Sequence, residues 1–253
     1  MIHVQRSPKP AVLQQNETDW LVALRTADAQ VRTATATHMQ GKTPTTKQAL
    51  NAAKKDFEAK QGRYAHPEIR ASLEGMFGTP LPGGSLLVKC AFCESYISHV
   101  SDEHIEHFRP KATYLSETYS WQNLLIACLV CNRDYKKTHF PLASDGSPLL
   151  LDPTIDQPDA HLDFVWDDVA LLASVVPKDA QGDETERLLG LNRSPLRTVR
   201  SEVVKILVFL AQQAPVDPEA CTLLCIATQA SSQYAAFARA LAAQHGISCD
   251  PVP

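Results

Sequence analysis

Cys90-Ala-Phe-Cys93 and Cys128-Leu-Val-Cys131 are two Cys-x-x-Cys pairs, and the 34 residues between them form the centre of this chain. Each pair has the spacing of a knuckle, a tight turn that aims two thiolates at one metal ion. Two pairs make a tetrahedral four-sulfur site, which has no open position and is therefore structural. Four buried cysteines or a redox-active Cys-x-x-Cys are the alternatives, and the presence of two pairs favours zinc. Because the separation exceeds that of a simple zinc ribbon, a subdomain stabilised by the metal must fold between the pairs.

The segment between the pairs carries side chains suited to metal-dependent hydrolysis. It contains His104-Ile-Glu-His107-Phe-Arg-Pro110 and Trp121-Gln-Asn123, and Asn132 directly follows the last cysteine. An imidazole can take a proton from water near neutral pH. Carboxylate and amide oxygens are the ligands that Mg²⁺ prefers. Hydrolysis of a phosphodiester needs an activated water, a Lewis acid and a rigid frame, and these residues can supply all three.

The composition is that of a globular protein. With 253 residues, 44% of them hydrophobic and 21% charged, we expect one large domain or two small ones around a shared centre. No apolar run reaches the roughly 18 residues of a membrane span, and the first residues lack the apolar stretch of a signal peptide. These features predict a cytoplasmic protein with no membrane association.

The seven cysteines predict a metal site rather than a disulfide framework. In a reducing compartment we expect four metal ligands and three free thiols. Cys221 and Cys225 lie four residues apart on an apolar helix, so we expect them in the core, whereas the pattern assigns no role to Cys249.

The charge of the chain argues against strong nucleic-acid binding by this protein alone. Its net charge is −4 and its pI is about 6.1, whereas a nucleic-acid-binding domain usually has a basic patch or a high pI. Two local basic clusters exist, one formed by Arg109 and Lys111 and the other by Arg133, Lys136 and Lys137. They are interleaved with the acidic residues Glu103, Glu106, Glu117 and Asp134. We therefore expect a partner to supply the binding surface.

Hydrophobic periodicity predicts an α+β chain that is mostly helical. We expect helices over 10–40, from a cap at Thr45 or Thr46 to about Lys60, from Pro67 to near Gly75 or Gly78, and over 183–253. Two apolar stripes are expected in the last segment, one formed by Val199, Val203, Ile206, Leu207 and Leu210, the other by Leu223, Leu224, Tyr234, Phe237 and Leu241.

The centre is expected to mix short strands with one helix. We predict extended segments at 86–88, 100–108, 149–151 and 162–165, a loop over 79–84 and a helix over 124–137. The expected division is a helical region over 1–84, a zinc-containing core over 85–147, and a mixed, then helical, region over 148–253 that forms a scaffold for docking a partner.

The order of these motifs resembles the HNH endonucleases, and more narrowly those of the Septu and retron-associated anti-phage defence family. In that family a Cys-x-x-Cys, an Ile-Glu-His-x-x-Pro-Lys, a Trp-x-Asn-Leu and a Cys-x-x-Cys-Asn follow one another. This chain also has the family's Phe140-Pro141 and Leu151-Asp152-Pro153, and Leu191-Asn192 and Arg200 fit its C-terminal part. The match is strong over 85–155 and loose in the flanks.

The resemblance implies a ββα-metal (HNH) nuclease core that uses one catalytic Mg²⁺ or Mn²⁺. His107 matches the general base, and Glu106 and Asn132 match the two metal ligands. Asn123 matches the central Asn, which ties the loop backbone and holds His107. Because Glu106 and His107 are adjacent, a regular strand would point them to opposite faces, so the strand must twist or end there.

The identity of the cation that contacts the phosphate stays open. The family usually has Asn-x-x-Lys, whereas this chain has Asn132-Arg-Asp-Tyr-Lys136-Lys137, which is one residue longer. Arg133, Lys136 and Lys137 are all candidates, with Arg109 as a further substrate contact. Nearby, His99 and His104 are surface histidines or substrate contacts, and Trp121 is expected in the core.

The resemblance also implies partners. A Septu protein works with an ABC-like ATPase, and a retron version adds a reverse transcriptase and its multicopy DNA. This chain lacks a Gly-x-x-x-x-Gly-Lys-[Ser/Thr] motif, so it should not hydrolyse ATP itself. Its nucleic-acid substrate is DNA or tRNA. The alternatives are a non-catalytic zinc-binding adaptor that docks on a partner protein and a Cys-x-x-Cys oxidoreductase.

Overall fold

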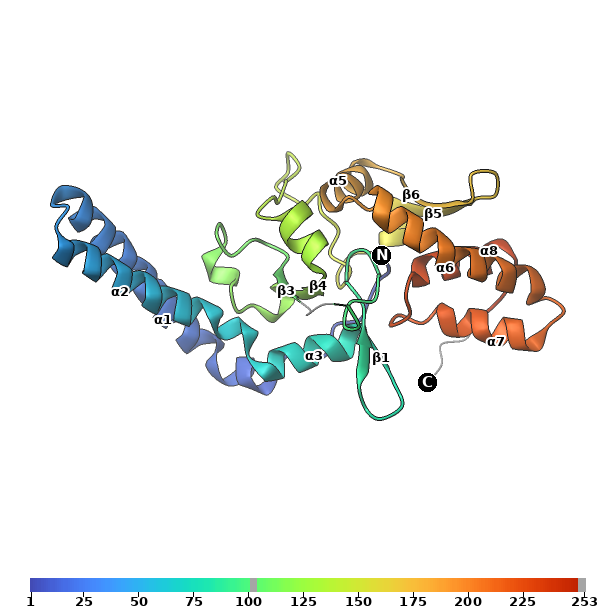
Figure 1. The fold of residues 1–253 in the computed structure, drawn as a ribbon, viewed down its shortest axis with the longest axis horizontal. Coiled ribbons are helices and arrows are strands. Elements are labelled where there is room, and N and C mark those ends of the chain that lie inside the picture. Colours follow the sequence, from blue (N-terminus) through green and yellow to red (C-terminus); the bar gives the residue numbers. More distant parts are fainter. Residues whose placement is uncertain (101–103, 250–253) are drawn as a thin grey trace. The chain divides into compact units, whose positions relative to one another are not determined.

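The computed structural model describes residues 1–100 and 104–249. Residues 101–103 of the extended segment expected over 100–108, Glu103 among them, lie outside the described residues. The chain is α+β and mostly helical, as predicted (Figure 1). It forms two compact units that each combine distant stretches of sequence. Unit 1 comprises Met1–Arg6, Glu74–Glu106 and Ile126–Pro253, and unit 2 comprises Ser7–Leu73 and His107–Leu125.

Unit 2 is built around two antiparallel helices, α1 (Ala11–Gln40) and α2 (Pro44–Gln61), which confirm the predicted helices (Figure 1). The prediction of the second cap was wrong. Pro44 takes the first helical position, where no N–H is needed, and the cap therefore falls on Thr43. The Thr46 amide donates to Thr43 Oγ1 at 3.2 Å, and the Thr43 amide donates to Thr46 Oγ1 at 3.1 Å, which completes a capping box.

The helices of unit 2 continue into the 3₁₀ helix η1 (Gly62–Ala65) and then into α3 (Pro67–Phe77), which was predicted from Pro67. Trp20 of α1 packs its ring against Tyr119, with ring centroids 5.6 Å apart. Trp121, in the short helix η3 (Trp121–Asn123), is buried as predicted, and its Nε1–H donates to Ser7 O at 2.9 Å. A second short helix, η2, covers Leu115–Glu117.

Two hairpins of unit 1 differ from the prediction. β1 (Gly78–Pro80) pairs with β2 (Leu86–Val88), so the loop expected over 79–84 begins as a strand. The turn follows at residues 81–84, where Gly83 and Gly84 have φ values of +93° and +84° that favour glycine. β5 (Leu162–Asp167) was predicted, but its partner β6 (Leu172–Pro177) was not.

Residues 149–151 are not a strand, contrary to prediction. Leu150 and Leu151 are buried, but the Leu151 amide donates to the side chain of Thr185 at 2.9 Å instead of to another strand. The short apolar run at 149–151 therefore indicated burial correctly, but the strand that it predicted is absent.

The helix predicted over 124–137 begins as a strand. β4 (Leu124–Ala127) pairs with β3 (His104–His107), and the chain then turns into the π-helix η4 (Val130–Lys136). All four β4 residues are buried. A fully buried strand and a buried helix both appear as continuous apolar runs, so periodicity could not separate them.

The C-terminal part of unit 1 packs α6 (Ser194–Gln213), α7 (Pro218–Ala227) and α8 (Ala235–Gln244) with the β5–β6 hairpin (Figure 1). The shorter helices α4 (Pro158–His161) and α5 (Ala180–Leu189) precede them. Among the helices of residues 1–100 and 104–249, none is both long and apolar enough to cross a membrane.

The stripe predicted on α6 is mostly on the wrong face. Val199 and Ile206 are 58% and 61% exposed, and only Leu207 of the expected stripe is buried. The buried face also repeats every three to four residues, but it contains an arginine, so a hydrophobic pattern does not reveal it. Its members include Leu196, Arg200, Val204, Leu207 and Ala211. Of the second stripe, Leu224, Tyr234, Phe237 and Leu241 are buried as predicted, whereas Leu223 is exposed.

Arg200 joins α6 to the neighbouring hairpin. Its guanidinium donates to Ala173 O at 2.6 Å and to Leu191 O at 2.8 Å. It also donates to Asn192 Oδ1 at 3.0 Å, and Asn192 itself bonds both the amide and the carbonyl of Val175. Burial lowers the pKa of Arg200 to about 10, so it remains charged at neutral pH. Arg200 and Asn192 therefore hold the scaffold together.

We expect Arg200→Met to lower the free energy of unfolding by about 3 kcal/mol or more, because three buried acceptors lose a charged donor. Urea denaturation followed by circular dichroism measures this change. Arg187→Met is the control, since Arg187 is exposed and paired with Glu184 on the surface of α5, and it should cost at most about 0.5 kcal/mol. Equal denaturation midpoints for the two variants would contradict the scaffold role.

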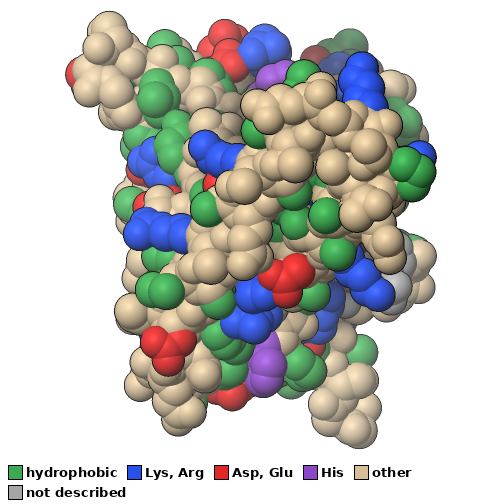
Figure 2. Space-filling model, turned by 90° about the vertical axis from the view of Figure 1, so that its left-hand side faces the viewer, with side chains coloured by type: hydrophobic (Ala, Val, Ile, Leu, Met, Phe, Trp, Pro, Cys, Tyr) green, Lys and Arg blue, Asp and Glu red, His purple; other side chains and the backbone are tan. Residues whose placement is uncertain are grey.

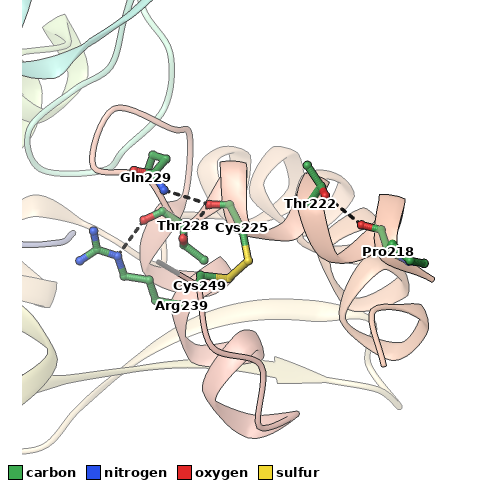
Figure 3. Close-up of a disulfide and its surroundings, with 7 residues drawn as sticks. All are labelled: Pro218, Thr222, Cys225, Thr228, Gln229, Arg239 and Cys249. Atoms are coloured by element: carbon green, nitrogen blue, oxygen red, sulfur yellow. Dashed lines mark hydrogen bonds between the residues drawn. A yellow bond between two sulfur atoms is a disulfide. The ribbon is translucent and has the colours of Figure 1, made fainter. Parts of the chain in front are cut away.

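The prediction of three free thiols outside the metal site was wrong. Cys225 of α7 forms a disulfide with Cys249, which follows α8 (Figure 3). Among the described residues, Cys221 is the free cysteine outside the four-cysteine cluster. Arg239 of α8 donates to Thr228 O at 2.8 Å and so links α8 to the end of α7 near the disulfide. The pairing depends on how α7 and α8 pack, so the spacing in sequence carried no signal for it.

Candidate functional site

The four cysteines of the two pairs come together in unit 1. Their sulfur atoms all lie within 4.8 Å of one another, and Cys93 Sγ is 4.0 Å from Cys128 Sγ. Zn–S bonds of about 2.3 Å in a tetrahedron place the sulfurs roughly 3.8 Å apart. All four residues are buried, as a closed structural site requires. The donor set and its spacing therefore fit a structural zinc ion.

Arg193 balances the negative charge of these thiolates. Its Nη2 donates to Cys131 Sγ at 3.5 Å, and its guanidinium lies over the ring of Tyr135. Burial opposes the charge of Arg193, but the neighbouring Cys131 and Cys93 outweigh burial and raise its pKa. Sequence reasoning missed Arg193, because it lies more than 60 positions after Cys131 in the chain.

The first knuckle ends in a residue with an unusual backbone. Glu94, directly after Cys93, has φ +62°, a conformation that favours glycine. Its buried carboxylate accepts from Lys89 Nζ at 2.8 Å and from the Met1 amino group at 2.9 Å. Burial disfavours the carboxylate, but these two cations outweigh burial and lower its pKa to about 2. The ion pairs thus hold Glu94 in place beside the metal site.

Glu106 and Lys136 form a buried ion pair in unit 1. Lys136 Nζ lies 2.5 Å from Glu106 Oε1, and both side chains are nearly inaccessible to solvent. The other two candidate cations are exposed: Arg133 pairs with the neighbouring Asp134, and Lys137 lies at the surface. Arg133, Lys136 and Lys137 were the three candidates for the phosphate contact. Of these, Lys136 is therefore the one that contacts Glu106.

The π-helix accounts for the spacing between Asn132 and Lys136. The Lys137 amide donates to Asn132 O at 2.7 Å, five residues back, so the turn holds one more residue than an α-helical turn. This matches the one extra residue relative to the family's Asn-x-x-Lys. Tyr135 in this turn packs against Gly190, where an added Cβ would lie 2.0 Å from the ring. Asn132 itself is half-buried in the first turn of η4.

His107 is buried in unit 2 with a defined tautomer. Its Nε2 lies 3.0 Å from Thr118 O, and because a carbonyl only accepts, Nε2 carries the hydrogen. In the neutral ring the basic lone pair is then on Nδ1. The ring of Tyr64, from η1, packs edge-on against the imidazole with centroids 4.5 Å apart. Sequence reasoning missed Tyr64 and Thr118, since neither belongs to a motif.

Asn123 fastens the loop that follows His107. Its Oδ1 accepts from the Arg109 amide at 2.7 Å, and its Nδ2 donates to the carbonyls of Arg109 and Glu117 at 3.0 Å. The residue after Glu117 is Thr118, the partner of His107. The side chain of Asn123 thus bonds backbone at both ends of residues 109–117, and this loop carries Arg109, Lys111 and Tyr114. The other two nearby histidines are less buried: His99 is exposed and His104 is half-buried.

Comparison with known proteins gives one informative match. No family model matches the chain, and no solved structure matches it. Septu protein PtuB from Bacillus mycoides (strain KBAB4) is 31% identical to it over 230 residues, a span that covers 81% of this chain and 68% of that protein. Identity at this level over most of both chains, with the motif order described above, shows that the chain belongs to the Septu PtuB family.

Proposed function

We propose that this chain is a metal-dependent HNH endonuclease that hydrolyses phosphodiester bonds in nucleic acid. The observation that carries the proposal is the state of His107. The imidazole is buried, its Nε2–H is held by Thr118 O, and its basic nitrogen is therefore Nδ1. A buried carboxylate, that of Glu106, is its neighbour in the chain.

In this proposal His107 acts as the general base and takes a proton from the attacking water at Nδ1. The edge of Tyr64 and the Thr118 carbonyl fix the orientation of the imidazole. Asn123 acts indirectly, because it fixes the loop that presents that carbonyl. Tyr64 and Asn123 are thus positioning residues, and His107 is the residue that touches the reacting water.

Glu106 and Asn132 would hold the catalytic Mg²⁺ or Mn²⁺. Their side-chain oxygens are the hard donors that these ions prefer. A carboxylate has two oxygens with about four lone-pair sites, so Glu106 can keep its contact with Lys136 and still bind a cation. When bound, the ion supplies Lewis-acid stabilisation of the phosphate and the leaving oxygen. Lys136 holds the Glu106 carboxylate through their ion pair, and Arg109, Arg133 and Lys137 contact the substrate.

Membership of the Septu PtuB family supports a role as the effector of an anti-phage defence complex. Its partner in this proposal is an ABC-like ATPase, joined in a retron by a reverse transcriptase and its multicopy DNA. The C-terminal region docks that partner. The exposed apolar side chains on α6, Val199, Ile206 and Phe209, support this assignment, because exposed apolar patches often mark protein contacts.

The direct test is a cleavage assay on the chain purified with its ATPase partner. Duplex DNA, single-stranded DNA and tRNA are each incubated with Mg²⁺, with Mn²⁺ and with neither ion. We expect at least one substrate to be cut with a divalent ion and none without it. If a zinc-loaded, intact complex cuts none of the three with either ion, the function is that of a zinc-binding adaptor.

A further inference from the structure

The near-neutral average charge of this chain hides a strong segregation of charge between its two units. Unit 2 has twelve Lys and Arg against seven Asp and Glu. Unit 1 has twelve Lys and Arg against twenty-one Asp and Glu. The expectation of weak unaided binding to nucleic acid rested on the average over both units. Unit 2, which contains His107 and Asn123, has the charge of a nucleic-acid-binding domain.

Three of the seven acidic residues of unit 2 pair with cations of the same unit. Glu17, Asp28 and Asp56 pair with Lys9, Arg32 and Lys60, respectively. By contrast, Lys47, Lys54 and Lys55 of α2 are exposed, and within residues 1–100 and 104–249 none of the three takes part in an ion pair. Figure 2 views the α1–α2 side of the molecule and shows Lys and Arg side chains reaching its surface.

The spacing of these lysines suits an extended polyanion. Lys47 and Lys54 are seven residues apart, so they project from the same face of α2, about 10 Å apart along its axis. The 18 residues of α2 span about 27 Å, which is the length of about eight base pairs of duplex. Glu58, also exposed, follows Lys54 by one turn and is the acidic member of this face.

The lysines of α2 lead along the chain to aromatic and basic residues around His107. Arg63 and Tyr64 of η1 directly follow α2, and Tyr64 packs on His107. Lys111 Nζ donates to Tyr64 Oη at 2.9 Å and lies 4.2 Å from its ring centroid. The cations of α2 are thus followed in the chain by Arg63 and by Tyr64, which packs on the buried imidazole of His107. We expect this order of residues for a surface that guides a phosphate backbone toward His107.

We propose that Lys47, Lys54, Lys55, Arg63 and Lys111, here called the basic arm surface, bind the sugar–phosphate backbone of the nucleic acid and guide it to His107. This inference rests on the proposed nuclease function, because it names the surface that delivers the substrate of that reaction. The phosphate backbone is common to DNA and RNA, so the surface recognises charge rather than sequence.

The test measures binding separately from cleavage. The full chain carrying His107→Gln keeps its substrate intact and leaves no cavity against Tyr64. Its affinity for fluorescent duplex DNA, single-stranded DNA and tRNA is measured by anisotropy over a range of salt concentrations. Lys47→Gln/Lys54→Gln/Lys55→Gln should weaken binding of the preferred substrate tenfold or more at low salt. The slope of log affinity against log salt should fall by about 2–3, since each lost duplex contact removes about 0.9. Glu58→Lys should tighten binding.

The matched control is Lys178→Gln/Arg187→Gln/Lys205→Gln, which removes the same charge from unit 1 and should leave affinity and slope unchanged. If both triple variants bind like the parent, or both weaken equally, the proposed surface is wrong. It is also wrong if the α2 variant keeps its affinity for nucleic acid but no longer elutes with the ATPase partner, because the surface then binds protein. Binding that falls as expected in a protein that never cleaves would overturn the nuclease function and leave the surface standing.

Discussion

Replacing Cys131 with alanine is expected to unfold the centre of unit 1 and to release its zinc. A structural zinc site contributes about 10–16 kcal/mol at neutral pH, which is comparable to the whole stability of a typical domain, about 5–15 kcal/mol. The cluster joins the segment after β2 to the segment after β4, so its loss frees both. The three remaining buried sulfurs would also lose the ion that balances their charge, and Arg193 would lose the Cys131 sulfur to which it donates.

Two measurements check this expectation. Elemental analysis of the native protein should find about one zinc per chain, and the Cys131→Ala variant should have lost it. Limited proteolysis should cut the variant within residues 85–140, where the native protein resists. Cys221→Ala is the control, because Cys221 is a free cysteine of α7 outside the cluster, and this variant should keep its zinc. A native protein without bound metal, or a Cys131→Ala variant as resistant as the native one, would show that these cysteines do not form a metal site.

The fold could be predicted from the sequence where local signals were strong. α1, α2 and α3 were predicted because proline, glycine and threonine mark their ends and because their apolar residues are well spaced. The strand β4 and the face of α6 were not. In both places burial is decided by tertiary packing: β4 is buried on both sides, and the buried face of α6 contains Arg200, which a hydrophobic pattern excludes.

Some residues of the candidate site could likewise be predicted from the sequence, and others could not. Cysteine spacing predicted the cluster, since four ligands of one metal must be close. The one extra residue between Asn132 and Lys136, relative to the family's Asn-x-x-Lys, left three candidate cations for the phosphate contact, because nothing in the sequence indicates a π-turn. Tyr64 and Arg193 were missed because each reaches the site from a distant segment through packing alone. Such residues are found only once the chain is folded.

The segregation of charge between the two units could be predicted from the sequence only in part. Every Lys and Arg is visible in the sequence, but the grouping is not, because each unit combines stretches that are far apart in the chain. Residues 107–125 add Arg109 and Lys111 to the basic helices, whereas residues 74–106 belong to the acidic unit. A net charge calculated for the whole chain therefore averages two units whose net charges have opposite signs.

Replacing His107 should reduce nucleic-acid cleavage by about 10²–10⁴-fold, which is the usual contribution of a general base. Because His107 is buried against Tyr64, alanine would also leave a cavity, so His107→Gln is the sharper variant. The glutamine amide can still donate to Thr118 O but has no nitrogen that takes a proton at neutral pH. Initial cleavage rates of the complex with Mg²⁺, compared at equal zinc content and equal melting temperature, measure the effect.

His104→Ala is the matched control for this measurement. His104 stands three positions earlier on the same strand and is only half-buried, so its loss should leave the cleavage rate within a few-fold of the native value. If His107→Gln and His104→Ala both cleave at the native rate, His107 is not the base. If His107→Gln is inactive while folded and zinc-loaded, loss of structure cannot explain the result, and the missing function is the proton acceptor at Nδ1.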